Sequence, residues 1–464
     1  MRFITPVVIF ALFISTLSAQ TESDTRILEM ADRIETRVAK IRDHEFKKSV
    51  GKGIYDKEQL GEFILESFEE ELPDEKAESW EASLKIFGLI PQKMDLKKTF
   101  VDFLVSQVGG FYDPEEKTLK CISSNLTFLL HIVMAHELLH ALQDQYLDLN
   151  GYYKGVDFND DLLGARQAVI EGEAQHMTTL YAQRYPQEIA GDMADMDPKD
   201  IGIFMIQQVA ASQGAPPYFM ETMTFPYIKG EQFIRKALDE GGWLMVDALY
   251  RRPPASTEQI LHPEKFFGDR DDPVKVVLPD MAPVLGSGYE KIYENTMGEM
   301  QLGVLVKLTV DPIRAMRAAK GWDGDTYAVY RHAPTGRSLM IWAVVFDSEQ
   351  DAQEFFEAEK KGFKNKYAAR EGSFDVAQIH RAASELSFDP ESIVHYAGRD
   401  GSIGVLHVHG KDVLVLDNFP GDFTLLDEAR EAAWGFLRQE FELEELNPEP
   451  FQYRPPETKK RRPW

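Results

Sequence analysis

The sequence contains the pattern His-Glu-Leu-Leu-His at residues 136–140, within a stretch that has the apolar composition of a buried helix. Residues four apart lie one above the other on a helix, so His136 and His140 can bind the same zinc ion. Glu137 directly follows His136 and can take a proton from a water on that ion. Because zinc lowers the pKa of its water from about 15.7 toward 7, a carboxylate can act as general base near neutral pH. The spacing therefore predicts a zinc-dependent hydrolytic centre.

A catalytic zinc site of this type needs a third protein ligand and keeps one position open. The metzincin motif continues with a glycine at the position of Gln143 and a third histidine at the position of Tyr146, so this chain does not fit it. The segment Val-Ile-Glu-Gly-Glu-Ala at 169–174 offers two carboxylates from a later helix. In thermolysin-like and aminopeptidase-N-like enzymes the ligand glutamate precedes a small residue by three positions, as Glu171 precedes Ala174. We therefore take Glu171 as the third ligand, with Glu173 as the alternative.

Peptide hydrolysis also needs a hydrogen-bond donor for the oxyanion of the tetrahedral intermediate. Tyr227 lies in Phe-Pro-Tyr-Ile-Lys-Gly at 225–230, which resembles the Tyr-x-Lys-Gly segment whose tyrosine has this role in aminopeptidase-N-like enzymes. His262, in the segment 253–263, is a second candidate. The sequence leaves the choice between Tyr227 and His262 open.

Several other polar residues have simpler interpretations. Asp144 follows His140 by one helical turn and is either a hydrogen-bond partner of a ligand histidine or an exposed charge. His131 and His176 are rotated away from the ligands and are taken as structural. His407 and His409 alternate along one strand, and a half-exposed strand face is favoured there over a second metal site.

Taken together, these segments resemble a group of exported bacterial HExxH proteins described as zinc metallopeptidases. The resemblance implies a gluzincin-like core related to thermolysin and aminopeptidase N, a Zn²⁺ cofactor, and a peptide or protein substrate. It also implies that the hairpin at 109–121 supplies the edge strand beside the active site. The matching segments are residues 87–91, 109–121, 134–146, 169–175, 225–234, 253–266 and 321–327.

Helical spacing of apolar residues predicts the elements that must position these side chains. Residues 22–105 look helical, with stretches at 21–41, 56–72 and 76–89, whereas the turn at Asp113-Pro114 divides a strand pair. Prolines and glycines mark 270–290 as a linker. Further helices are expected at about 125–146, from Asp160 or Asp161 past 181, and at about 200–212, 228–240 and 242–251.

The second half reads as a separate α+β domain with an antiparallel sheet. A helix at about 298–319 precedes it, and a helix at 348–367 divides its strands. A closing helix is expected over Thr424–Phe441. Strands are expected at 326–333, 338–346, 375–382, 392–398, 402–410 and 411–417.

The predicted fold class is therefore α+β: a mainly helical zincin-like core with a short edge hairpin, followed by a smaller antiparallel-sheet domain. The predicted organisation is a signal peptide at 1–19, a helical N-terminal region at 20–105, a metallopeptidase core at 106–290, an α+β domain at 291–445 and a disordered tail at 446–464.

Composition limits the functions open to a chain of this kind. The 464 residues carry 51 basic and 77 acidic side chains, a net charge of −26, which disfavours binding to nucleic acid. A single cysteine, Cys121, excludes internal disulfides and cysteine-based zinc sites, and it is read as a small buried hydrophobe. The apolar run that begins at Phe3 has the layout of a secretory signal peptide, and no other stretch is apolar enough to span a bilayer. We expect a periplasmic or extracellular protein.

The sequence therefore predicts an exported zinc metallopeptidase. An endopeptidase is favoured over an aminopeptidase, because the Gly-x-Met-Glu-Asn segment that binds a free amino terminus is absent. The alternative from another class is a catalytically idle metal-binding or scaffold protein of the cell envelope. The sequence also leaves open whether the helices of 22–105 cover the cleft as a pro-segment would.

Overall fold

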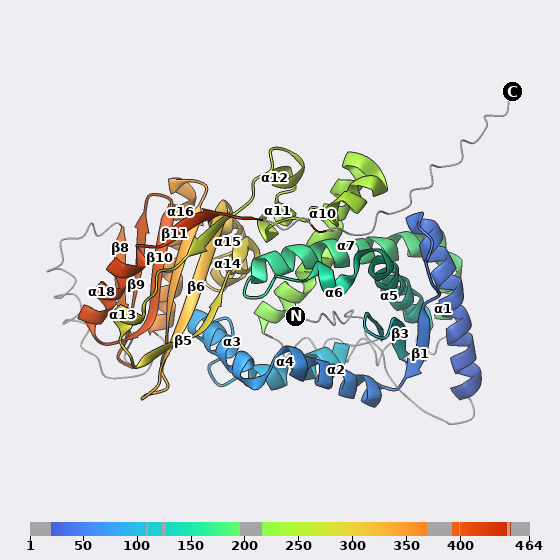
Figure 1. Ribbon diagram of the computed structural model, residues 1–464, viewed down its shortest axis with the longest axis horizontal. Coiled ribbons are helices and arrows are strands. Elements are labelled where there is room, and N and C mark those ends of the chain that lie inside the picture. Colours follow the sequence, from blue (N-terminus) through green and yellow to red (C-terminus); the bar gives the residue numbers. More distant parts are fainter. Residues whose placement is uncertain are drawn as a thin grey trace.

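The described chain consists of a helical unit and a sheet unit, so the predicted α+β class is confirmed (Figure 1). The computed structural model describes residues 20–107, 110–122, 127–194, 216–368, 392–398, 400–442 and 446. The predicted signal peptide, the helix at 200–212, the strand at 375–382 and nearly all of the tail at 446–464 lie outside the described residues. Within the described ranges, no helix has both the length and the apolar composition needed to cross a membrane.

The helical unit is built around α5, whose residues are almost all buried. A helix that is apolar on nearly all sides must be covered on all sides. Accordingly α5 contacts α1, α7 and α8, and α7 packs along α10. The helices of this unit are α1 (Gln20–Arg42), α5 (Thr127–Leu147), α6 (Leu149–Tyr152), α7 (Asp160–Arg184), α8 (Pro186–Ala194), α10 (Pro217–Leu249), α11 (Thr257–Leu261) and α12 (Glu264–Phe267).

Helix α7 starts with a different cap from the one predicted. Asp160 and Asp161 were the predicted caps, but the side chain of Asn159 accepts the hydrogen bond from the Leu162 N–H at 2.8 Å. An asparagine satisfies a free N–H at a helix start as well as an aspartate does. This leaves Asp161 free to turn inward, where it is buried.

Helix α10 is longer than predicted. The sequence suggested separate helices at 228–240 and 242–251, but α10 begins at Pro217 and bends at Gly241 and Gly242. Gly242 has a φ of 64°, which few residues other than glycine adopt. The predicted break is therefore real, although the chain continues through it as a kink.

The predicted hairpin is confirmed, but it belongs to a three-stranded sheet. β2 (Gly110–Asp113) pairs antiparallel with β3 (Thr118–Ile122), and β1 (Gly51–Tyr55) pairs parallel with the other side of β3. Strand β1 lies between the first two helical stretches predicted in 22–105, and no strand was predicted there. A glycine-containing five-residue strand has little periodicity of its own, and its partner lies far along the chain. β2 is left at the edge of the sheet.

The N-terminal helices are divided between the two units. Helix α1 packs on α5, whereas α3 contacts the large sheet. The Phe87 ring at the end of α3 lies 5.0 Å from the Tyr327 ring and 5.2 Å from the Trp342 ring. The remaining helices of this region are α2 (Lys57–Glu71), α3 (Asp74–Phe87) and α4 (Leu96–Gln107).

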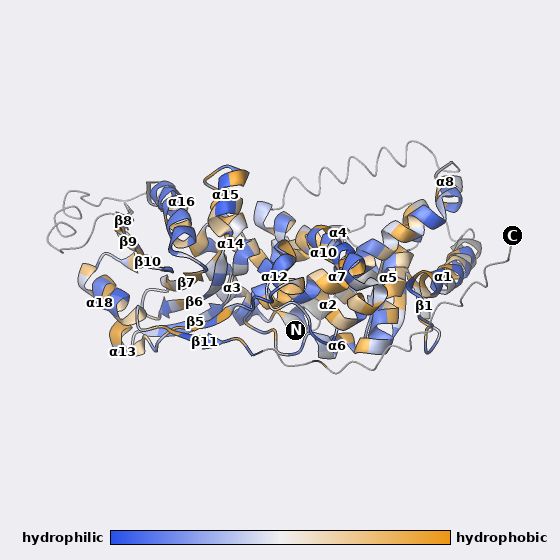
Figure 2. Ribbon diagram, turned by 90° about the horizontal axis from the view of Figure 1, so that it is seen from above, coloured by the Kyte–Doolittle hydropathy of each residue, from blue (hydrophilic) through white to orange (hydrophobic). Residues whose placement is uncertain are grey.

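The sheet unit holds six strands in the order β5-β6-β7-β10-β9-β8, and every neighbouring pair is antiparallel, as predicted. Helices α14, α15 and α16 cover one face, and α13 and α18 cover the other. Figure 2 shows that α16 is mostly hydrophilic along its length, as expected for a helix with one face in solvent. The elements are β5 (Tyr289–Asn295), β6 (Trp322–His332), β7 (Ser338–Phe346), β8 (Ile393–Ala397), β9 (Ser402–His409), β10 (Asp412–Pro420), α13 (Ala282–Leu285), α14 (Gly298–Lys307), α15 (Pro312–Ala319), α16 (Glu349–Ala368) and α18 (Phe423–Ala433).

Three predictions about the ends of this unit need correction. The helix expected at 298–319 is divided into α14 and α15, because Asp311 caps a new helix that starts at Pro312. The closing helix ends at Ala433 instead of Phe441. The residues after it form β11 (Leu437–Glu440), which pairs with β4 (Val274–Val277) inside the predicted linker. A strand pair between distant segments leaves no local signal in either segment.

Candidate metal centre

His136, His140 and Glu171 meet in the interior of the helical unit. The histidines lie one turn apart on α5, with their ring centroids separated by 4.7 Å. Glu171 faces them from α7, and its Oε2 lies 3.0 Å from His136 Nε2 and 3.5 Å from His140 Nε2. One ligand atom from each residue lies within 4.8 Å of the others. This buried group could therefore hold a metal ion, as the sequence predicted.

The hydrogen bonding of the group fits such an ion. His140 Nε2, Glu171 Oε1 and Glu137 Oε1 are buried, and each lacks a hydrogen-bond partner among the described residues. Buried polar atoms in folded proteins are nearly always satisfied. Two imidazole nitrogens and one carboxylate oxygen, with an adjacent carboxylate, match the donor set of a three-ligand metal site that keeps a position for water.

The electrostatics of the group favour a positive charge at its centre. Burial would raise the pKa of Glu171, but the two imidazoles hold it well below its usual range. Burial would lower the pKa of His140, but Glu171 raises it to about 9. Burial lowers the pKa of His136 and outweighs the hydrogen bond to Glu171. A cation bound here would face the ionised Glu171, and its binding would compete with protonation of His140.

Glu137 lies next to the ligands in a narrow crevice. Its Oε2 accepts a hydrogen bond from the Tyr112 N–H of β2 at 2.8 Å. Burial raises its pKa to about 8, near the range in which a general base is most effective. His140 and Tyr153 line the same crevice, whose volume of about 20 Å³ holds about one water molecule. Larger clefts lie elsewhere among the described residues, so cavity size alone would not have located this centre.

Of the two candidates for the oxyanion donor, the structure brings only Tyr227 to the metal ligands. Its ring stacks on the His136 ring with centroids 5.9 Å apart, and its side chain hydrogen-bonds Glu171. Burial and two nearby carboxylates raise the pKa of Tyr227 well above its ordinary value, so the hydroxyl keeps its proton. His262 lies against α14 instead, with its Nε2 2.9 Å from Glu299 Oε1.

Two glycines allow helices α7 and α10 to lie close enough together for Tyr227 to contact Glu171. A Cβ atom on Gly172 of α7 would lie 2.2 Å from the Gly230 carbonyl carbon, and one on Gly230 would lie 2.2 Å from the Ala168 oxygen. No other residue allows the backbones of α7 and α10 to approach this closely. The glycine after Glu171 and the glycine three residues after Tyr227 therefore hold both residues at the same centre.

The sequence assigned no role to Gln143, which lies one turn after His140 on α5. Its Oε1 lies 2.8 Å from His140 Nδ1, and its amide nitrogen lies 3.1 Å from Glu173 Oε2. Glu173 also forms a buried ion pair with Arg42 of α1. The alternative ligand Glu173 is thus held in a polar network behind the site. The i, i+3 spacing could have indicated the contact between Gln143 and His140, but nothing local could have indicated Arg42.

Asp144 has neither of its predicted roles. It is buried, and its Oδ2 accepts hydrogen bonds from the Tyr112 hydroxyl at 2.8 Å and from Lys117 Nζ at 2.7 Å. Asp144 therefore ties α5 to the hairpin that carries the Tyr112 N–H. It supports the site through the edge strand instead of through a ligand histidine.

The remaining histidines on the helices have structural contacts. His131 lies 3.1 Å from the Tyr181 hydroxyl and 3.0 Å from Asp192, and His176 lies 3.6 Å from Glu231. These contacts connect neighbouring helices, in agreement with the structural role that the sequence predicted.

The residues expected to be unreactive also have such contacts. His407 Nδ1 accepts a hydrogen bond from Trp434 Nε1 at 2.9 Å, and among the described residues only the His136 group could hold a metal ion. Cys121 is buried, and burial raises the pKa of its thiol to about 12. A thiol in this environment is a poor nucleophile.

Comparison with known proteins gives a family match for part of the chain. A family model described as a domain of unknown function (DUF8575) matches residues 287–418, which lie in the sheet unit. No curated protein matches the chain. A crystal structure from Chloroflexus aurantiacus, described as a candidate hydrolase with a novel fold, is 17% identical, with a TM-score of 0.38, over 55% of this chain and 90% of that chain. This likeness is too low to show a shared fold.

Proposed function

We propose that the protein is a zinc metallopeptidase that cleaves within peptide chains after export from a bacterial cell. The observation that carries the proposal is the buried convergence of His136, His140 and Glu171 with Glu137 beside them. His136, His140 and Glu171 would hold the metal ion. Bound zinc would act as a Lewis acid and lower the pKa of its water toward 7.

The other residues of the site have separate roles in this proposal. Glu137 accepts the proton of the attacking water through Oε1, the oxygen that has no hydrogen-bond partner among the described residues. It then passes that proton to the leaving amine. The Tyr112 N–H holds the other oxygen of Glu137, which keeps the carboxylate directed into the crevice. Tyr227 donates a hydrogen bond to the oxyanion.

A catalytically idle metal-binding protein is the second candidate. The narrowness of the crevice favours it, since about one water fits there and a peptide does not. In the peptidase proposal, the walls formed by β2 and by the residues after α6 must separate to admit substrate.

The experiment compares the wild type with Glu137→Gln and His136→Ala, and measures bound zinc and the cleavage of an unfolded protein. We expect one zinc per wild-type chain, and a Glu137→Gln variant that keeps its zinc but loses about 100- to 10,000-fold in rate, as is typical of a lost general base. His136→Ala should lose the zinc. Equal cleavage by the wild type and Glu137→Gln would reject the peptidase, and a wild type without zinc would reject the centre.

A further inference from the structure

A continuous chain of buried polar contacts leads from the ligand His140 to the N-terminal helix α1. It passes from His140 to Gln143, then to Glu173, and ends at Arg42. These four side chains are between 0% and 5% exposed. Polar groups this deeply buried are costly unless each is paired, so the chain is a specific arrangement of matched donors and acceptors.

The contacts of Gln143 determine which nitrogen of His140 carries the proton. The amide nitrogen of Gln143 faces the Ile170 carbonyl oxygen at 3.2 Å, and a carbonyl can only accept a hydrogen bond. The amide oxygen of Gln143 therefore faces His140 Nδ1, which must donate. A proton on Nδ1 leaves the lone pair of His140 Nε2 directed at Glu171 and available for a metal.

Arg42 forms the end of this series of buried polar contacts that lies farthest from His140. Its guanidinium forms ion pairs with Glu173 and Asp247 and stacks on the Trp243 ring at 4.5 Å from the ring centre. Glu173 is fully buried, so its charge depends on this cation. Arg42 thereby holds Glu173 in place to receive the Gln143 amide.

We propose that Gln143 is a positioning residue of the metal centre, and that α1 is a permanent part of that centre through Arg42. The inference rests on the proposed metal site and deepens it. It excludes the role of a removable pro-segment for α1, because removal of the helix would leave Glu173 buried without its cation.

The first test measures zinc affinity by competition with a chromogenic chelator. Gln143→Leu removes the acceptor for His140, and we expect about 10- to 100-fold weaker zinc binding, the usual effect of losing a partner behind a ligand histidine. Gln145→Leu is the matched control, because Gln145 lies on the same helix and, among the described residues, hydrogen-bonds the backbone of Lys48 alone. The zinc affinity of Gln145→Leu should stay within about 2-fold of that of the wild type, a much smaller change than the loss expected for Gln143→Leu.

Gln143→Glu keeps an acceptor for His140, and because two facing buried carboxyls share a proton, its protonated oxygen can still donate to Glu173. We expect its zinc affinity to stay within about 3-fold of the wild type, a smaller loss than that of Gln143→Leu. Wild-type affinity in folded Gln143→Leu, or an equal loss in Gln143→Glu, would overturn the role of Gln143. A wild type that binds no zinc would instead overturn the proposed function.

The second test compares two arginines of α1. Arg42→Met interrupts the series of buried polar contacts between α1 and His140. We expect zinc binding to weaken by about 10-fold, the lower end of the range expected for Gln143→Leu. Arg37→Met is the control, since Arg37 pairs with Glu188 and contacts the Tyr185 ring, away from this series of contacts. Equal zinc affinity in the two folded variants would overturn the role of α1.

Discussion

At the scale of single residues, the two carboxylates of the site differ in their surroundings. Glu171 faces two imidazoles, which keep it ionised. Glu137 is equally buried but receives only the Tyr112 N–H, and its pKa rises to about 8. Two buried carboxylates with pKa values shifted in opposite directions are typical of a site where one binds and the other exchanges protons.

Tyr227 provides a prediction at this scale. Replacing it with phenylalanine keeps the ring on His136 and removes only the hydroxyl. Loss of one oxyanion donor lowers kcat by about 100- to 1,000-fold, so Tyr227→Phe should show this loss with KM nearly unchanged and zinc retained. His262→Ala should keep a kcat near that of the wild type. Steady-state kinetics of both variants decides between them, and the opposite pattern would assign the role to His262.

At the scale of elements, the crossing of α7 and α10 determines the geometry of the site. The two helices meet through Gly172 and Gly230 without room for a methyl group. Glu171 and Tyr227 lie next to this contact, one on each helix. A change in the distance between the helices would therefore move the proposed metal ligand and the proposed oxyanion donor at the same time.

Gly172→Ala tests the crossing. The new methyl group would overlap the Gly230 backbone, and overpacking of this kind costs about 1–3 kcal/mol. The thermal midpoint and the zinc affinity should both fall. Gly303→Ala is the control, because its new methyl would have only the Ala319 Cβ nearby, at 3.6 Å, and alanine is favoured over glycine in a helix by up to about 1 kcal/mol. A similar thermal midpoint in the two variants would contradict the argument.

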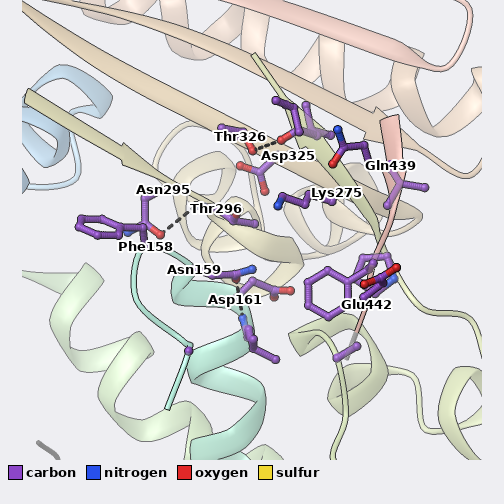
Figure 3. Close-up of a pocket in the computed structure, with 18 of the residues that line it drawn as sticks. Phe158, Asn159, Asp161, Lys275, Asn295, Thr296, Asp325, Thr326, Gln439 and Glu442 are labelled. Carbon is purple, nitrogen blue, oxygen red and sulfur yellow. Dashed lines mark hydrogen bonds between the residues drawn. The ribbon is translucent and has the colours of Figure 1, made fainter. Parts of the chain in front are cut away.

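At the scale of the whole molecule, buried polar contacts join the two units beside a cleft of about 730 Å³ (Figure 3). Asp161, near the start of α7, accepts hydrogen bonds from the backbone N–H and the hydroxyl of Thr257 in α11. The Thr257 hydroxyl in turn accepts a hydrogen bond from the Met300 N–H of α14, in the sheet unit, at 3.2 Å. The Asp161 carboxylate also occupies the position that a side chain on Gly298, at the start of α14, would need. Burial raises the pKa of Asp161 to about 8.

This shift predicts how stability depends on pH. The unfolded chain releases the Asp161 proton near the ordinary value of 3.8, whereas the folded chain keeps it up to about pH 8. The folded state binds more protons between these values, so stability falls as pH rises from about 4 to 8. Asp161→Asn, which keeps an oxygen acceptor for Thr257, should make this decline in thermal midpoints less steep. Asp311→Asn, an exposed helix cap, should keep it, and equal slopes for the two variants would refute the prediction.

Much of the site was predictable because its signals are local. The i, i+4 spacing of the histidines on α5 follows from helix geometry, and the apolar pattern of that helix indicated burial. The antiparallel strands of the sheet unit were also recognisable, since each is a short run of β-branched and aromatic residues. Strands β1, β4 and β11 were not predicted, because short strands that pair with distant segments have weak patterns of their own.

The sequence by itself determined the chemistry that the centre can perform, namely two histidines and a glutamate in fixed register on one helix. Only the tertiary structure decided which later carboxylate meets them. Glu171 and Glu173 lie two positions apart on α7 and therefore point in different directions, one toward His136 and the other toward Arg42. The choice depends on how α1, α5 and α10 surround α7. Contacts between segments more than a hundred residues apart form only when the chain folds.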